Sequence, residues 1–128
     1  MSLDFDNLEI YTLLLKICKK YSVDPSSSLN AESFFRTLLA EYSGKFDSLE
    51  IAQWLEEKVA NSFICMKDRP KWIQSSEWPF DNNHPVIFIG QIDVSVDEKP
   101  LMQIFHDATS FYLFINNKGE TTIITQQY

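Results

Sequence analysis

Residues 111–125, FYLFINNKGETTIIT, form the stretch of sequence that decides the fold of this chain. Two runs of aromatic and β-branched residues, 111–115 and 121–125, stand on either side of Asn116-Asn117-Lys118-Gly119. Such runs favour β-strands, and asparagine and glycine tolerate the positive φ angles of a tight turn. The stretch therefore predicts a β-hairpin.

Two further short apolar runs precede the hairpin. They are residues 86–89 (VIFI) and 101–105 (LMQIF). Both have strand-like composition, and Gly90 at the end of the first run is typical of a β-bulge. With the hairpin, these runs predict an antiparallel sheet of four strands.

The first half of the chain has helical periodicity instead. Apolar residues repeat at helical spacing over three stretches: 6–21, 30–42, and 47 to the Asp68-Arg69-Pro70 sequence. Asp6, Asn30 and Asp47 are expected N-caps, and Gly44 stands where a C-cap glycine belongs. The pattern predicts three helices.

Length and composition indicate one domain over residues 1–128. A chain of 128 residues with 45% hydrophobic residues has the size and composition to build one core. We expect a helical half, residues 1–69, and a loop plus antiparallel sheet, residues 70–128. The predicted fold class is α+β, with the three-helix segment packed on one face of the four-stranded sheet.

The net charge of −7 counts against a nucleic-acid or membrane partner, since both present polyanionic surfaces. The first residues lack the cationic start of a secretory signal, and no apolar run approaches the roughly 20 residues of a membrane span. Cys18 and Cys65 are interpreted as buried small hydrophobes and not as a disulfide. These features together suggest a cytoplasmic protein.

The negative charge is uneven along the chain. Residues 1–71 carry 11 acids and 9 bases, whereas residues 72–128 carry 7 acids and 2 bases. Residues 72–98 contain five acids and no base, together with Trp72, Trp78 and Phe80. Aromatic side chains anchor protein interfaces and carboxylates steer a basic partner toward them, so this segment is a candidate contact surface.

The candidate partner-binding residues are Glu77, Trp78, Phe80, Asp81, Asp93, Asp97, Glu98 and Asp107. The alternative is that the acids are simply solvated and the aromatic residues cover the core. For Trp72 we prefer that alternative, whereas Trp78 and Phe80 fit either interpretation equally.

Catalytic and metal-binding patterns give little support for an enzyme. Three glycines scarcely suffice for a phosphate-binding loop, and the two histidines and two cysteines lack metal-ligand spacing. His106 and Asp107 resemble a base with its orienting carboxylate, but neighbouring residues of a strand point to opposite faces. We expect no catalytic residue, metal or cofactor, and a hydrolase using His106 and Asp107 remains the third hypothesis.

Five segments of the second half form a recognisable pattern: 69–74 (RPKWIQ), 77–85 (EWPFDNNHP), 88–91 (FIGQ), 105–107 (FHD) and 111–114 (FYLF). This pattern resembles small bacterial proteins encoded beside polymorphic toxins, including immunity proteins of contact-dependent growth inhibition systems. The resemblance implies a cytoplasmic, non-enzymatic inhibitor that binds one cognate toxin domain, in many cases a nuclease with a basic cleft. It leads us to expect a monomer outside that complex.

A secretion chaperone that binds an effector segment is the second hypothesis. Such chaperones are also small, acidic, cytosolic α+β proteins. They typically end in a helix, whereas residues 121–126 of this chain are strand-like. The immunity protein is therefore the leading hypothesis from the sequence.

Overall fold

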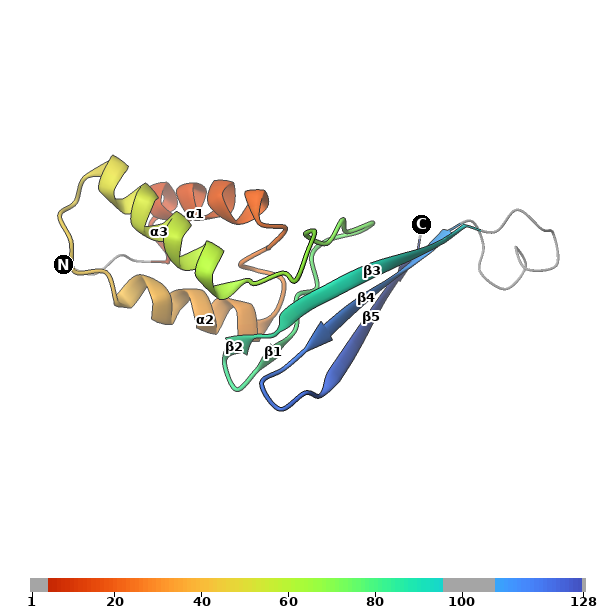
Figure 1. Ribbon diagram of the computed structural model, residues 1–128. Helices are drawn as coiled ribbons and strands as arrows, with labels where there is room; N and C mark the ends of the chain where they lie inside the picture. Colours follow the sequence, from red (N-terminus) through yellow and green to blue (C-terminus); the bar gives the residue numbers. More distant parts are fainter. Residues whose placement is uncertain (1–4, 96–107, 128) are drawn as a thin grey trace.

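A computed structural model describes residues 5–95 and 108–127, and it confirms the α+β class (Figure 1). The elements in chain order are helices α1 (Leu8–Lys20), α2 (Leu29–Ala40) and α3 (Ser48–Ser62), then strands β1 (Phe80–Asp81), β2 (His84–Pro85), β3 (Ile87–Ser95), β4 (Ala108–Ile115) and β5 (Thr121–Gln127).

The three helices form where apolar periodicity predicts them, but two of the expected N-caps are displaced. Asn7, and not Asp6, caps α1, because its side-chain oxygen accepts hydrogen bonds from two N–H groups of the first turn. Ser28, and not Asn30, caps α2 in the same way. Asp47 caps α3 as predicted. In all three cases the backbone of the capping residue is extended, and its side chain accepts hydrogen bonds from free N–H groups of the first helical turn.

Two helices end earlier than their apolar patterns suggest. Glu41 closes α2 in the right-handed α conformation, so Gly44 does not act as its C-cap. Helix α3 ends at Ser62, because the chain beyond it hydrogen-bonds to β3 instead of continuing the helix. The N–H of Phe88 donates to the Ile64 carbonyl, and the Met66 N–H donates to the Phe88 carbonyl, each at 2.9 Å.

The prediction of a four-stranded sheet is wrong. Strands β3, β4 and β5 form a three-stranded antiparallel sheet in that order, and β1 and β2 form a separate small hairpin. The expected strand at 101–105 lies outside the described residues. Strand β3 runs on to Ser95, well beyond the expected apolar run, and the predicted bulge is confirmed by a register shift between Phe88 and Gly90.

The hairpin predicted from residues 111–125 is present. Ile115 pairs with Thr121, and the Asn116 N–H donates to the Glu120 carbonyl at 3.0 Å. Gly119 has a φ of 81°, the left-handed conformation that makes glycine suitable for this turn.

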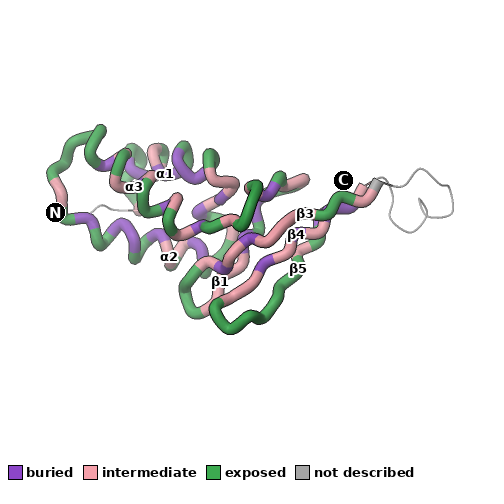
Figure 2. The backbone as a smooth tube through the Cα atoms, viewed as in Figure 1, coloured by how far each residue is buried: buried purple, intermediate pink, exposed green. Residues whose placement is uncertain are grey.

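The core lies between the helices and the end of the sheet where β3 begins and β4 ends (Figure 2). Its fully buried side chains from the helical half are Leu14, Phe35, Leu39, Leu55, Val59 and Phe63, and those from the sheet are Phe88, Tyr112 and Phe114. Each such side chain contributes about 1.5–3 kcal/mol by burial. The two halves therefore share one hydrophobic core.

The helices do not cover the whole inner face of the sheet. Figure 1 shows β3, β4 and β5 projecting past the helical layer. Residues 71–78, called here the covering segment, lie against this part of the sheet through Trp72 and Trp78. The Trp72 ring packs on Tyr112 at 4.4 Å between centroids, and its Nε1 donates to the Ser22 carbonyl. Trp72 thus covers the core, as preferred above.

Gln126 on β5 fastens the covering segment to the sheet. Its side-chain oxygen accepts hydrogen bonds from the N–H groups of Ile73 and Gln74, both at 2.9 Å. Its Nε2 donates to the Ser75 carbonyl and to Glu77 Oε2, both at 2.8 Å. Gln126 is 2% exposed, and a buried amide needs hydrogen-bond partners. All four of these partners are protein groups of the covering segment.

Tyr112 and Gln91 complete this polar attachment. The Tyr112 hydroxyl donates to the Lys71 carbonyl at 2.9 Å and accepts from the Ile73 N–H at 3.1 Å. Gln91 of β3 accepts from the Lys71 N–H and donates to the Lys71 carbonyl. An irregular segment can lie over the sheet only because these side chains pair its backbone groups.

Both cysteines are free, as expected from the sequence, but only Cys18 is buried as predicted, whereas Cys65 is half-buried. Cys18 is fully buried in α1, and burial raises the pKa of its thiol far above the ordinary value. Within residues 5–95 and 108–127, no helix combines the length and apolar character needed to cross a bilayer.

Replacing Gln126 with leucine should lower the free energy of unfolding by about 2–3 kcal/mol, because buried backbone groups of the covering segment lose their partners. The measurement is urea denaturation of the purified protein. Gln127→Leu is the matched control, since its side chain is exposed, and should change stability by less than about 0.5 kcal/mol. Equal stabilities of the two variants would contradict the role given to Gln126.

Thr109 provides a second stability prediction. Its hydroxyl is buried and has no hydrogen-bond partner in the described part of the chain. Thr109→Val should therefore leave stability unchanged or raise it by up to about 1 kcal/mol, because no hydrogen bond is lost. The neighbouring Ser110→Ala should lower it by about 1 kcal/mol, since Ser110 donates to Asp93. A marked loss for Thr109→Val in thermal or urea unfolding would refute this account.

Candidate functional site

Five of the eight predicted contact residues lie in the described part of the chain, and the structure does not gather these five on one surface. Asp97, Glu98 and Asp107 lie outside the described residues, as does His106 of the hydrolase hypothesis. The other five come from the covering segment, from β1 and from β3.

Trp78 belongs to the core and is removed from the candidate contact residues. Its side chain is 2% exposed, and its Nε1 donates to the Val86 carbonyl at 2.8 Å. The ring packs against Phe63 at 5.2 Å and Phe114 at 5.4 Å between centroids. A side chain enclosed on every side cannot anchor a partner, so the core interpretation holds for Trp78.

Phe80 lies at the margin of the same aromatic cluster. It is half-buried in β1, with its ring 5.7 Å from that of Phe34 and 5.9 Å from that of Phe63. Phe80 thus joins the small β1–β2 hairpin to the helices and presents only part of its ring to solvent.

Each of the three described acids among the candidate residues, Glu77, Asp81 and Asp93, accepts a side-chain hydrogen bond. Glu77 is exposed, but its carboxylate accepts from the Gln126 side chain. Asp93 accepts from Ser110 Oγ at 2.5 Å and from Gln91 Nε2 at 2.8 Å. The Ser110 and Gln91 hydrogen bonds, with a smaller contribution from Lys71, hold the pKa of Asp93 below its ordinary value.

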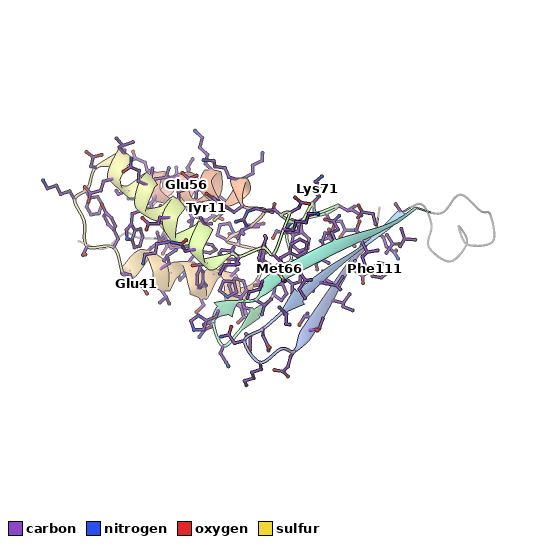
Figure 3. All side chains as sticks on the ribbon, in the orientation of Figure 1. Tyr11, Glu41, Glu56, Met66, Lys71 and Phe111 are labelled. Carbon is purple, nitrogen blue, oxygen red and sulfur yellow. The ribbon has the colours of Figure 1, made fainter. Side chains whose placement is uncertain are left out.

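Basic residues line a groove that also contains Asp93, although none follows Asp93 closely in sequence. The charged residues that line this groove beside β3 are Lys67, Asp68, Arg69, Lys71 and Asp93. Figure 3 shows Lys71 beside this strand. Asp93, which belongs to the base-free segment 72–98, therefore lies in the same groove as Lys67, Arg69 and Lys71, the bases that precede this segment in sequence. The acidic excess seen along the sequence does not form a continuous acidic surface here.

Asp81 forms an acidic pair with Glu120 at the hairpin end of the sheet. Asn116 Nδ2 donates to Asp81 Oδ2 at 3.1 Å and to Glu120 Oε1 at 2.9 Å. This pair lies next to Ile115, whereas Asp93 is paired with Ser110. Five residues of an extended strand separate these positions by about 17 Å. Sequence reasoning did not select Glu120 as a contact residue.

The most distinctive surface is the side of the β3–β4–β5 sheet that faces away from the covering segment, called here the open sheet face. Strand pairing and the alternation of side chains place these residues on it: Ile87, Ile92, Val94, Phe111, Leu113, Ile115, Thr121, Ile123 and Thr125. Thr109 points to the same side of the sheet but is buried. Ile92 is 55% exposed and Ile123 is 59% exposed. None of these residues is charged.

Gly90 adds to the openness of this face. It pairs with Leu113, and a Cβ atom built on Gly90 would meet no atom within 4 Å. Phe111, labelled in Figure 3, stands between Ile92 and Thr125 in the strand register. Large apolar side chains thus form adjacent rows over three strands without a described element covering the middle of the face.

A sequence signal for this face does exist. Strand β4 is apolar at almost every position from Phe111 to Ile115, and such a run is typical of a strand covered on both sides. In the structure Tyr112 and Phe114 face the core, while Phe111, Leu113 and Ile115 are only half-buried. The second apolar side is therefore a candidate contact surface.

The described residues include no group of three or more histidine, cysteine or acidic side chains that could hold a metal ion. His84 is exposed on β2. What the arrangement offers chemically is an uncharged apolar face with a pair of carboxylates at one end. Such a surface suits contact with another protein.

Comparison with known proteins yields no relative. No protein-family model matches the chain, and neither a curated protein nor a solved structure matches it.

Proposed function

We propose that this chain is a non-enzymatic immunity protein that binds a cognate toxin domain, with a basic nuclease domain as the preferred target. The observation that supports the proposal best is the open sheet face with the Asp81–Glu120 pair at its hairpin end. The proposal also rests on the resemblance of the second half to immunity proteins. An inhibitor of this kind acts in the cytoplasm.

The apolar part of this surface can supply binding energy. Aromatic and aliphatic side chains at the centre of an interface carry most of the affinity of protein complexes. Phe111 and Leu113 lie in the middle strand of the sheet, and the exposed Ile92 and Ile123 flank them. A preformed sheet loses little conformational entropy on binding.

The charge distribution favours a basic partner. Among the described residues of the sheet half, 72–95 and 108–127, Lys118 is the only base, against Glu77, Asp81, Asp93 and Glu120. Because Asp93 shares its groove with Lys67, Arg69 and Lys71, we assign the electrostatic role to Asp81 and Glu120. Complementary charge raises association rates toward about 10⁸–10⁹ M⁻¹s⁻¹ at low salt, an advantage for an inhibitor that must bind before the toxin acts.

Co-expression tests the proposal in cells. The toxin domain encoded by the gene beside this one should arrest growth when expressed alone, and this chain should restore growth. The purified pair should form a complex of two folded proteins. Continued growth arrest with both proteins present would contradict the proposal, and capture of an unfolded segment instead of a folded domain would favour the secretion chaperone.

Two variants test which surface binds. Ile92→Lys should weaken binding to the toxin domain by about 10-fold or more, because an interface centre tolerates an unpaired charge poorly. The double variant Asp81→Lys with Glu120→Lys should slow association and reduce its salt dependence. Glu41→Lys with Glu57→Lys, on the exposed helical surface, is the control with the same change of charge. Equal association rates for the two double variants would exclude the acidic pair from the interface.

A further inference from the structure

Strand β5 is an edge of the sheet, and the structure shows which of its backbone groups face outward. The Asn116 N–H donates to the Glu120 carbonyl, so residues 116 and 120 form a hydrogen-bonded pair. Hydrogen-bonded pairs alternate along an antiparallel ladder, so they recur at 114–122, 112–124 and 110–126. The backbone groups of residues 121, 123, 125 and 127 therefore point away from β4.

Only the last of these outward residues has a described partner. The Gln127 carbonyl accepts a hydrogen bond from Gln74 Nε2 at 2.8 Å, which agrees with its outward direction. For Thr121, Ile123 and Thr125, the described part of the chain supplies no backbone partner on that side. Thr121, Ile123 and Thr125, every second residue of β5, thus each offer an N–H and a carbonyl to another strand.

Strand β5 lacks the devices that usually protect an edge. Its sequence TTIITQQ has no charge, proline or glycine, and its pairing with β4 runs over seven residues without a bulge. The opposite edge is protected over its first residues, because β3 carries the bulge at Gly90 and its Phe88 is hydrogen-bonded to the chain after α3. The β5 edge therefore offers an uninterrupted row of outward backbone groups for strand pairing, whereas the β3 edge is interrupted at Phe88 and Gly90.

We propose that a second copy of this chain pairs with β5 in antiparallel orientation about a two-fold axis, joining two sheets into one of six strands. The register is centred on Ile123, which lies opposite its own copy, while Thr121 lies opposite Thr125. This register uses all three outward residues and forms six backbone hydrogen bonds. It also pairs Ile123, 59% exposed in one copy, with an identical apolar side chain.

Charge favours a second copy over a basic segment at this edge. No residue of β5 is charged, so a basic strand would find no carboxylate on it. In the antiparallel register each Glu120 faces Gln126 of the other copy, whereas parallel pairing would place the two Glu120 carboxylates side by side. Because both copies carry a net charge of −7, added salt should strengthen this association.

Cross-linking tests the register. In a Cys65→Ser background, Ile123→Cys places two thiols directly opposite one another, about 5.5 Å apart at Cα. Thr121→Cys is the matched control, because the two copies of residue 121 would be about 14 Å apart. A bismaleimide with a two-carbon linker should join Ile123→Cys into a covalent dimer at least 10-fold faster than Thr121→Cys. Equal rates would overturn the register.

Molar mass in solution tests the association itself. Light scattering from about 5 to 500 μM protein should show the mass rising from 14.9 kDa toward twice that value, more steeply at high salt. Thr125→Pro should abolish the rise, because it removes an outward N–H without breaking a bond to β4. Ile92→Lys, on the far strand, should leave it unchanged. A constant mass of one copy, or loss of the dimer with Ile92→Lys but not with Thr125→Pro, would overturn the proposal.

Discussion

The attachment of the covering segment to the sheet is the constraint on which the rest of the structure depends. Its backbone has no helix or strand partners, so its buried groups need side-chain partners. Gln126, Tyr112 and Gln91 meet that need from three different strands. Once attached, the segment places Trp72 and Trp78 over the core and commits one face of the sheet to the interior.

Because the covering segment and the helices pack on one face of the sheet, the exposed side chains Ile92 and Ile123 lie on the other face. Among the described residues the sheet has three strands, so one face, two edges and a hairpin end are available, and each has a distinct character. The open sheet face is apolar, and the chain after α3 pairs with the β3 edge at Phe88. The β5 edge is uncharged, and the hairpin end holds Asp81 and Glu120. The proposed toxin contact uses side chains of the open face and the hairpin end, whereas the proposed self-pairing uses the outward backbone groups of β5. The two proposals share the side chain of Ile123.

Local features were predictable where local physics decides them. The three helices, the turn at Asn116–Gly119 and the bulge at Gly90 follow from periodicity and from the conformational freedom of asparagine and glycine. The caps at Asn7 and Ser28 were missed by one or two residues, because several polar residues near each helix start can serve as caps. The extent of β3 was missed because polar residues such as Gln91 and Asp93 interrupt its apolar pattern, although both bond to neighbouring chain segments.

The sequence by itself determined the α+β class, the helical first half, the hairpin and the overall negative charge. Only the tertiary structure decided where Trp78 lies, which acids stand together and which side of the sheet stays open. The physical reason is that burial and electrostatic surroundings depend on segments far apart in sequence. Asp93 meets Lys71 across a groove, Asp81 meets Glu120 through Asn116, and Trp78 is enclosed by Phe63 and Phe114. The charge summed along the sequence does not show these contacts, because folding brings residues that are far apart in sequence next to one another.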